Sequence, residues 1–171
     1  MQSRANKIEP TGSLEYRNAM AEVPASVNVV TTVFEGQRFG FTASAVSSVS
    51  DDPPTLLVCI NRASSSFQAF ASATHFWVNT LSKHQVSIAN AFGGKARQEE
   101  RFDVGNWSYG TTGQPVLPDA AVQFECELMQ FLDLATHRIL FGRVLNTNIN
   151  EDVTSLVYHK RQYRIAEELA R

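Results

Sequence analysis

The sequence is poor in the features that mark several large classes of protein. Its 171 residues include only two cysteines, Cys59 and Cys126, which are too few for a disulfide framework. The formal net charge is −2, so the chain lacks the basic excess of nucleic-acid and anionic-membrane binders. No apolar run approaches the roughly 20 residues that span a bilayer. Since we also find no apolar secretory segment near the N-terminus, we expect a cytoplasmic protein without nucleic-acid or membrane partners.

Several familiar catalytic motifs are missing as well. The nine glycines form neither a G-x-G-x-x-G motif nor a Walker A loop, which disfavours a Rossmann or P-loop domain. The sequence contains no H-E-x-x-H and no C-x-x-C, and its four histidines share no metal-ligand spacing, so we expect no metal site. The absence of G-x-S-x-G disfavours an α/β-hydrolase.

The composition that is present predicts one folded domain, because 43% of the residues are hydrophobic and only 19% are charged. Residues 1–12 are polar and contain Pro10 and Gly12, so we expect a flexible N-terminal tail there. The single domain is expected to cover residues 13–171. Its first element is a helix that Ser13 caps and Pro24 ends.

Most of the domain shows the patterns of β-strands. Val27–Val33 is rich in β-branched residues, and Val122–Leu128 alternates apolar with polar residues. The continuous apolar run Thr55–Ile60 predicts a strand buried on both faces. We expect further strands at Phe39–Thr42, Phe76–Leu81, Arg138–Leu145 and Ser155–Tyr158. Short helices are expected over Ser65–Ala71, from Ser82 toward Phe92, and over Arg97–Phe102. No β-α-β alternation is sustained, so the prediction is a mainly β, antiparallel barrel with a few peripheral short helices.

Two segments contain many small hydroxyl residues. In Gly40–Ser50, small side chains would let a flat ligand lie against the backbone, with hydroxyl and N–H groups at its polar edge. The alternative is an edge strand with a polar face. Asn61–Ser66 follows a predicted buried strand and opens a predicted helix, so its serines and Arg62 suit a phosphate group. The alternative there is ordinary helix capping by one serine.

Two later segments carry titratable side chains. His137 is expected where a long strand begins, at the mouth of the barrel, where it could contact a ligand or transfer a proton near neutral pH. A solvated strand end is the alternative. The segment Tyr158–Arg164 could close a site for an anionic aromatic cofactor, or it could be a solvated basic turn.

These segments occur together in a specific order. The set is Ala25–Thr32, Thr42–Ser50 with Pro53-Pro54, Leu57–Arg62, Val78–Leu81, Glu99–Phe102, Thr136-His137 and Leu156–Tyr163. In this order the chain resembles the short-chain flavin reductases of the FMN-binding split-barrel superfamily. It is most similar to the reductase components of two-component aromatic monooxygenases, such as the 4-hydroxyphenylacetate and chlorophenol systems. The resemblance runs from about Tyr16 to Tyr163.

The resemblance implies an antiparallel split β-barrel that works as a homodimer and uses FAD or FMN together with NADH or NADPH. The residues it places at the flavin are Thr42, Ala43, Ser44, Ala45, Ser47, Ser48, Asn61, Arg62, Ser64, Ser65 and Arg97. Those it places at NAD(P)H are His137, His159 and Tyr163, and His137 is also the one candidate for a catalytic role. Many relatives have Gly-Asp-His where this chain has Ala135-Thr136-His137, so an acidic partner for His137 is missing at that point, although Asp133 is close in sequence.

The implied activity is reduction of flavin by NAD(P)H, with release of the reduced flavin to a separate flavin-dependent aromatic (phenol) monooxygenase. Two alternatives stay open. One is an enzyme that keeps its FMN bound and reduces another acceptor, such as a corrin. The other is a flavin-binding module without turnover.

Overall fold

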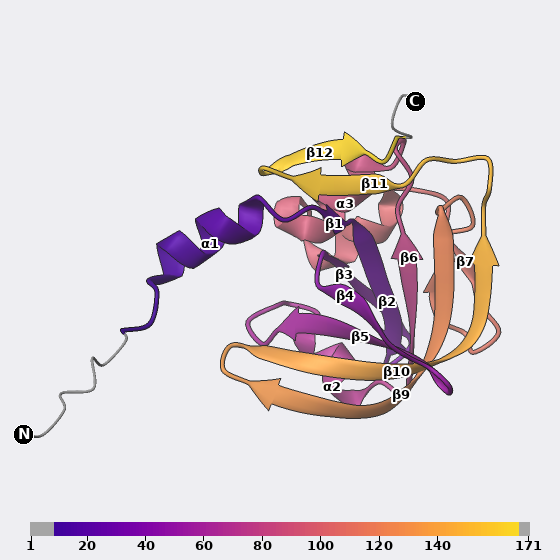
Figure 1. Cartoon of the computed structure of the whole chain (residues 1–171). Coiled ribbons are helices and arrows are strands. Elements are labelled where there is room, and N and C mark those ends of the chain that lie inside the picture. Colours follow the sequence, from indigo (N-terminus) through magenta and orange to yellow (C-terminus); the bar gives the residue numbers. More distant parts are fainter. Residues whose placement is uncertain (1–8, 168–171) are drawn as a thin grey trace, which may run out of the picture.

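The computed structural model describes residues 9–167, in which a helix at the N-terminal end, α1 (Ser13–Ala21), precedes a domain built mainly of strands (Figure 1). Residues 1–8 of the expected tail and residues 168–171 of the expected domain lie outside the described residues. The helix begins at Ser13 as expected, but Gly12 occupies the cap position and no side chain caps the helix. The prediction that Ser13 is the cap was therefore wrong by one residue.

The main sheet contains seven strands, all antiparallel to their neighbours. They are β2 (Asn28–Phe34), β3 (Gln37–Ala43), β4 (Val46–Asp51), β5 (Pro54–Asn61), β6 (His75–Thr80), β9 (Val122–Leu134) and β10 (His137–Ile149). Their order across the sheet is β3-β2-β6-β9-β10-β5-β4. The two edge strands, β3 and β4, are separated along the chain by only Ser44 and Ala45. The sheet must therefore curl until its edges meet, and because no ladder joins β3 to β4 in the described part, the barrel is split as predicted.

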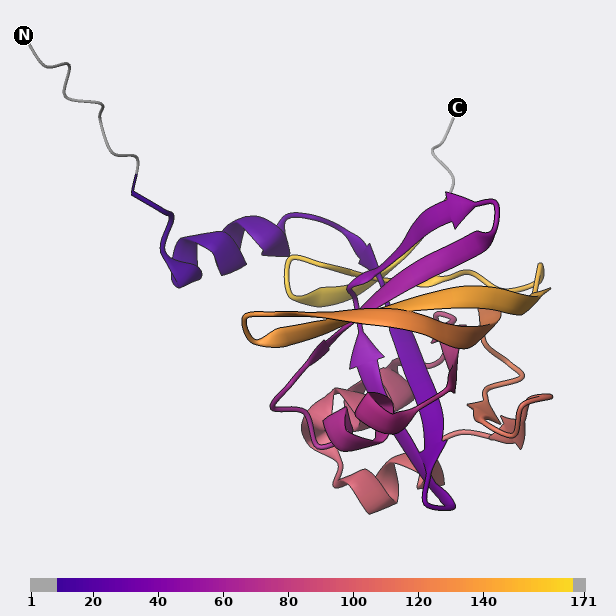
Figure 2. The ribbon, with the colours of Figure 1, turned by 90° about the horizontal axis from the view of Figure 1, so that it is seen from below.

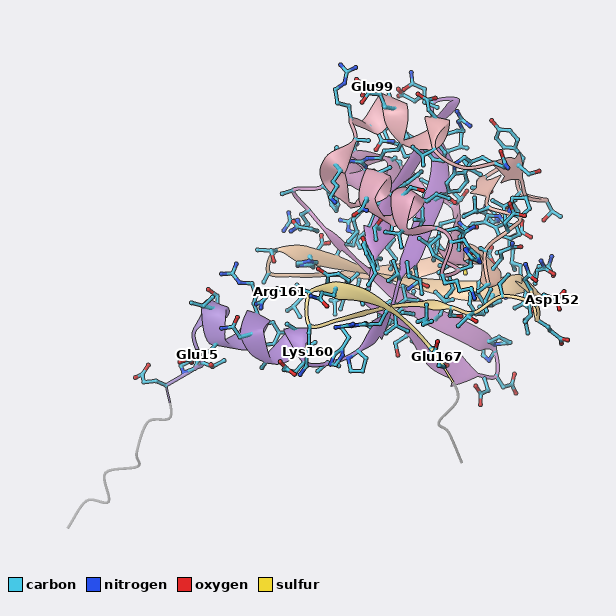
Figure 3. All side chains as sticks on the ribbon, turned by 90° about the horizontal axis from the view of Figure 1, so that it is seen from above. Glu15, Glu99, Asp152, Lys160, Arg161 and Glu167 are labelled. Carbon is cyan, nitrogen blue, oxygen red and sulfur yellow. The ribbon has the colours of Figure 1, made fainter. Side chains whose placement is uncertain are left out.

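Two small sheets complete the strand structure. The first contains β1 (Ala25–Ser26), β11 (Leu156–His159) and β12 (Gln162–Ile165), in the order β1-β11-β12, and the second pairs β7 (Ser108–Tyr109) with β8 (Pro115–Val116). The tight turn between β11 and β12 holds Lys160 and Arg161, which lie beside α1 (Figure 3). Lys160 Nζ is 3.1 Å from a carboxylate oxygen of Glu22, and Arg161 donates a hydrogen bond to Asn18 Oδ1.

The helices are short and lie at the periphery. They are α2 (Phe67–Ser72), α3 (Val86–Asn90), the π-helical segment η1 (Ala91–Lys95) and the 3₁₀ segment η2 (Gln98–Asp103). The helix expected to start at Ser82 starts at Val86, because Gln85 Oε1 accepts the Ser82 N–H and closes a separate turn. It ends at Asn90 and continues directly into η1, within which Gly94 adopts a positive φ of 101°. Over residues 9–167, no helix combines the length and apolarity needed to cross a membrane.

Apolar side chains pack on both faces of the sheet. Inside the barrel, Val58, Phe76 and Leu140 belong to one buried cluster, and burying each side chain of this size contributes about 1.5–3 kcal/mol. On the other face, Phe92 and Phe102 belong to a second cluster that joins η1 and η2 to the sheet. Figure 2 shows these helical segments gathered on one side of the strands. The helices thus cover the end of the barrel next to the β3–β4 junction.

The strand β5 corrects one expectation. Leu56, Val58 and Ile60 are buried, but Leu57 and Cys59 are only half-buried, so the strand is not buried on both faces. The reason is that, among the described residues, no layer covers this part of the outer face of the sheet. The continuous apolar run of β5 therefore supplies one core face and one apolar face that is partly open to solvent.

Candidate functional site

A cavity of about 380 Å³ opens where the barrel is split. Its walls come from the link between β3 and β4, the end of β5 and the loop that follows it, the segment η1, and the beginning of β10. The lining residues are Phe41, Thr42, Ala43, Ser44, Ala45, Cys59, Asn61, Ser64, Ser65, Phe92, Gly93, Gly94, Arg101 and His137. Elements far apart in the sequence thus meet at one concave surface, which is the arrangement expected of a ligand site.

The structure brings eight of the predicted site residues to this cavity. They are Thr42, Ala43, Ser44, Ala45, Asn61, Ser64, Ser65 and His137. The pairing of β5 with β10 places His137 directly opposite Asn61. The segments proposed for the flavin ring, the flavin phosphate and the nicotinamide therefore share one site.

The other predicted residues lie elsewhere. Ser47 and Ser48 line a second cavity, of about 440 Å³, on the barrel side of β4. Arg62 is exposed and is not part of the lining, although its backbone N–H donates to Thr136 O. The side chain of Arg97 is 72% exposed and is hydrogen-bonded to Glu100. His159 is half-buried on β11 and is also outside this lining.

Tyr163 lies next to the cavity rather than in it. Together with Tyr158 and Val27 it lines a smaller cavity of about 180 Å³ that shares Thr42, Ala43 and Ser44 with the first. Its hydroxyl donates to Asn90 Oδ1 at 3.2 Å, and burial raises the pKa of its phenol. The ring packs edge-on against Tyr158, with 5.4 Å between the centroids. The two tyrosines thus form an aromatic wall beside Ser44.

Arg101 is the one charged residue among the described lining residues of the cavity, and the sequence assigned it no role. Its side chain reaches from η2 to the wall of the cavity, where it donates to Gly40 O at 2.8 Å and to Ser65 Oγ at 3.1 Å. Further bonds reach Ser66 Oγ and Gln98 Oε1. The residue is only 7% exposed, and none of the described carboxylates forms an ion pair with it. Burial lowers the pKa of the guanidinium, and the neighbouring Glu99 only partly offsets this.

A buried cation without a carboxylate is costly unless another anion completes its surroundings. The anion-seeking groups at this end of the cavity are Arg101 and the hydroxyls of Ser64 and Ser65. Planar guanidinium groups bind phosphate oxygens with strong, charge-assisted hydrogen bonds. This end of the cavity therefore fits a phosphate group.

Local structure explains why the serine loop faces the cavity. Asn61 Oδ1 accepts the N–H of Ala63, and Asn61 O accepts the N–H of Ser64, so the chain turns immediately after β5. Ser64 Oγ in turn accepts the N–H of Ser66. These bonds fix the loop before α2 begins at Phe67, two residues later than the predicted start.

The opposite wall is made of small residues. Ser44 is exposed and stands in the two-residue link between β3 and β4, and Gly93 has only the Thr42 side chain within 4 Å of a Cβ built on it. Gly40 is required nearby, because a Cβ there would lie 2.7 Å from the ring of Phe92. The Thr42 hydroxyl is already committed to Ala89 O. Space for a flat ligand therefore lies along Ala43–Ala45 rather than against the Thr42 hydroxyl.

His137 stands at the rim of the cavity. Its Nδ1 is 2.9 Å from Thr136 Oγ1, and its ring is exposed. The nearby carboxylate of Asp133 does not pair with His137, because both of its oxygens accept hydrogen bonds from Arg138, at 2.7 and 2.8 Å. Cys59 lines the cavity as well, and burial raises the pKa of its thiol, which keeps it in the poorly nucleophilic thiol form.

Comparison with known proteins places the chain among flavin-reducing enzymes. The sequence profile described as a flavin reductase like domain matches residues 20–167. The FMN reductase (NADH) RutF of Pantoea ananatis is 47% identical over 159 residues, which cover 93% of this chain and 84% of that protein.

Solved structures give the same result. A protein from Haemophilus somnus described as a flavin reductase has a TM-score of 0.88 and 39% identity, and the match covers 91% of this chain and all 100% of that one. BorF, the flavin reductase component of a bacterial two-component tryptophan halogenase, has a TM-score of 0.84 and 28% identity, with 92% of this chain and 100% of BorF covered.

Proposed function

The chain belongs to the flavin reductase family, and we propose that it uses NADH to reduce free FMN and releases the reduced flavin to a separate flavin-dependent oxygenase. The chain is an oxidoreductase that reduces flavin with NAD(P)H. FMN and NADH are the pair we assign, because the 47% identical relative is named for both.

Arg101 is the single observation that carries the assignment of FMN. It is a buried guanidinium that pairs with no carboxylate of residues 9–167, and it stands beside Ser64 and Ser65 in the cavity wall. The terminal phosphate of FMN would supply the missing anion. The small residues Ala43–Ala45 at the other wall leave the flavin ring room to lie against the backbone. The exposed Ser44 hydroxyl and nearby N–H groups can stabilise negative charge at the polar edge of that ring.

When bound, FMN supplies the ring whose N5 accepts a hydride from the nicotinamide C4 of NADH. The task of the protein is to hold the two rings in contact, at roughly 3–3.5 Å, and to exclude unproductive orientations. His137 at the rim can orient the nicotinamide side through one hydrogen bond, since its ring is exposed and none of the described carboxylates contacts it. No side chain of the cavity is needed as a proton donor for the hydride step itself.

Replacing His137 with alanine is expected to raise KM for NADH by about five- to thirtyfold, the equivalent of one lost ligand hydrogen bond and some lost packing. KM for FMN should stay almost unchanged, and kcat should fall only modestly. Steady-state kinetics with NADH varied at saturating FMN measures this. A large loss confined to kcat would instead show general-acid catalysis, and unchanged constants would remove His137 from the site.

The function is tested by adding a small amount of the purified protein to NADH and an excess of FMN and following the NADH absorbance. The proposal predicts that the protein consumes NADH in large molar excess over itself, because free FMN is its substrate. Consumption only with another acceptor, such as a corrin, would favour an enzyme that keeps its FMN. No consumption with any acceptor would indicate a flavin-binding module.

The receiving partner we propose is a flavin-dependent monooxygenase, and BorF supports a separate flavin-consuming component because it is named as part of a two-component halogenase. An aromatic or phenolic substrate for that oxygenase stays a prediction, as does a cytoplasmic location. Mixing the reductase with candidate oxygenases and measuring product only when both proteins, NADH and FMN are present would identify the partner.

We propose in addition that the chain acts as a homodimer. The helix α1 has no buried residue, and its apolar side chains Leu14 and Met20 are exposed. The tip of the β9–β10 hairpin exposes Leu132 and Leu134. Figures 1 and 2 show α1 and this hairpin tip projecting from the same side of the molecule. A second copy on that side would cover both apolar surfaces and the open mouth of the cavity.

Replacing Leu132 with glutamate is expected to weaken dimerisation at least about tenfold, because it places a charge in a contact that excludes water. Ile149→Glu is the matched control, since Ile149 is also an exposed apolar residue, at the far end of β10. Sedimentation at micromolar concentration measures both variants. A wild-type protein that sediments as a monomer with full activity would contradict the homodimer.

A further inference from the structure

Arg138 is the second residue of β10, directly after His137, and it is not part of the cavity lining. Its side chain is only 12% exposed. The guanidinium carbon lies 3.8 Å from the centroid of the Phe131 ring and 5.1 Å from that of Phe67. Phe131 belongs to β9, whereas Phe67 begins α2, directly after the serine loop. Arg138 therefore connects the hairpin tip to the loop that lines the phosphate end of the cavity.

The same side chain also fixes the hairpin itself. Its Nε donates to Asp133 Oδ1 at 2.7 Å and its Nη2 to Asp133 Oδ2 at 2.8 Å, across the strand register that pairs the two residues. This fork is the geometry that only arginine provides. Asp133 also lies near the exposed Arg62, whose backbone N–H donates to Thr136 O at 2.9 Å.

The position of His137 depends on this tip. Residues 129–137 are all exposed, so little packing holds the end of the hairpin. Successive residues of a strand point to opposite faces, so His137 faces the cavity rim while Arg138 faces Phe67 and Phe131. Arg138 therefore does not contact a ligand in the cavity itself and can affect one only through its neighbour His137.

We propose that Arg138 is a positioning residue for the nicotinamide side of the site. By linking Asp133 of the hairpin to Phe67 beside the serine loop, it supports the end of β10 at which the His137 side chain stands. The proposal rests on the proposed function, because it assigns the purpose of the clamp to NADH binding. Small displacements at such a site have large kinetic effects, since a shift of about 1 Å can cost up to roughly a hundredfold in rate.

The test compares Arg138→Met with Arg143→Met in the full-length protein. Arg143 is on the same strand and pairs with Glu127 across the same hairpin, but it is not part of the cavity lining. Arg138→Met is expected to raise KM for NADH about three- to tenfold, with kcat and KM for FMN nearly unchanged. Arg143→Met should match the wild type in all three constants. The thermal unfolding temperatures of both variants show whether a change in KM is accompanied by a general loss of stability.

Two further variants separate positioning from a merely structural role. Adding Arg138→Met to His137→Ala should change KM for NADH by less than about twofold, because coupled residues are not additive. Asp133→Asn keeps Arg138 but weakens its two hydrogen bonds to residue 133, so this variant should also raise KM for NADH. It tests the proposal even if Arg138→Met does not fold.

Fully additive effects, or an Arg138→Met variant indistinguishable from Arg143→Met, would overturn the proposal while leaving flavin reduction intact. A wild-type protein that oxidises no NADH with FMN would overturn the proposed function, and this proposal with it.

Discussion

Replacing Arg101 with methionine should raise KM for FMN by about thirty- to a hundredfold while leaving KM for riboflavin within about twofold. The reason is that a hydrogen bond to a charged group is worth about 1.5–3 kcal/mol, and the guanidinium would offer the phosphate such bonds from inside the cavity wall. Riboflavin has no phosphate, so it does not depend on Arg101. Steady-state kinetics with each flavin at saturating NADH measures the difference.

The matched control for this prediction is Arg97→Met. Arg97 is four residues away on the same segment and carries the same charge, but its side chain is 72% exposed and pairs with Glu100. It should change neither flavin constant, although the family resemblance placed Arg97 among the flavin-binding residues. Arg101 also donates hydrogen bonds to Gly40 O and Ser65 Oγ. If Arg101→Met raised KM for FMN and KM for riboflavin equally, the role of Arg101 would therefore be to stabilise the local structure and not to bind the phosphate.

Replacing Ser44 with leucine should weaken FMN binding by more than about thirtyfold. Ser44 lies in the link between β3 and β4 and lines the candidate cavity, so a leucine side chain there would take up space that the ligand needs. The loss combines one hydrogen bond of ~0.5–1.5 kcal/mol with a steric term of ~1–3 kcal/mol. Because the residue is exposed, the free protein should keep its thermal stability. Fluorescence titration with FMN measures the binding.

Ser47→Leu provides the informative comparison. The family resemblance implied that Ser47 contacts the flavin, but Ser47 lines the separate cavity on β4. Since Ser47 lies outside the candidate flavin cavity, we expect Ser47→Leu to bind FMN with the affinity of the wild type. Equal losses in Ser44→Leu and Ser47→Leu would show that the flavin extends along β4, and wild-type binding by both would remove the segment from the site.

Local patterns in the sequence were sufficient to find several strands but not to say which side chains are buried, since Gln123 and Glu125 of β9 are both buried. The alternation in Val122–Leu128 gave β9, and the β-branched run Val27–Val33 gave β2 within one residue at each end. Patterns failed where burial depends on distant elements. The apolar run of β5 looks the same whether its outer face is covered or open. The strand β12 (Gln162–Ile165) was missed because only four residues, two of them polar or charged, form it.

The site was predictable only in part for the same reason. Ser44 and His137 are 93 positions apart, and no local pattern brings them together; only the resemblance to a family did. Arg101 was missed because its burial comes from contacts with Gly40 and Ser65, which lie 61 and 36 positions away. Its neighbours Glu99 and Glu100 made it look like part of an exposed, charged turn. Arg97, in the same turn, has that exposure and was assigned the role instead.

The central claim is that this chain is an NADH-dependent FMN reductase whose cavity binds the flavin phosphate at Arg101. The most direct measurement is NADH oxidation by the purified wild-type protein with FMN and with riboflavin in parallel. The account predicts sustained NADH consumption in molar excess over the protein, with KM for FMN at least about tenfold below KM for riboflavin, since one phosphate contact of this kind is worth more than about 1.4 kcal/mol. No NADH consumption with either flavin, or equal KM values for the two, would contradict it.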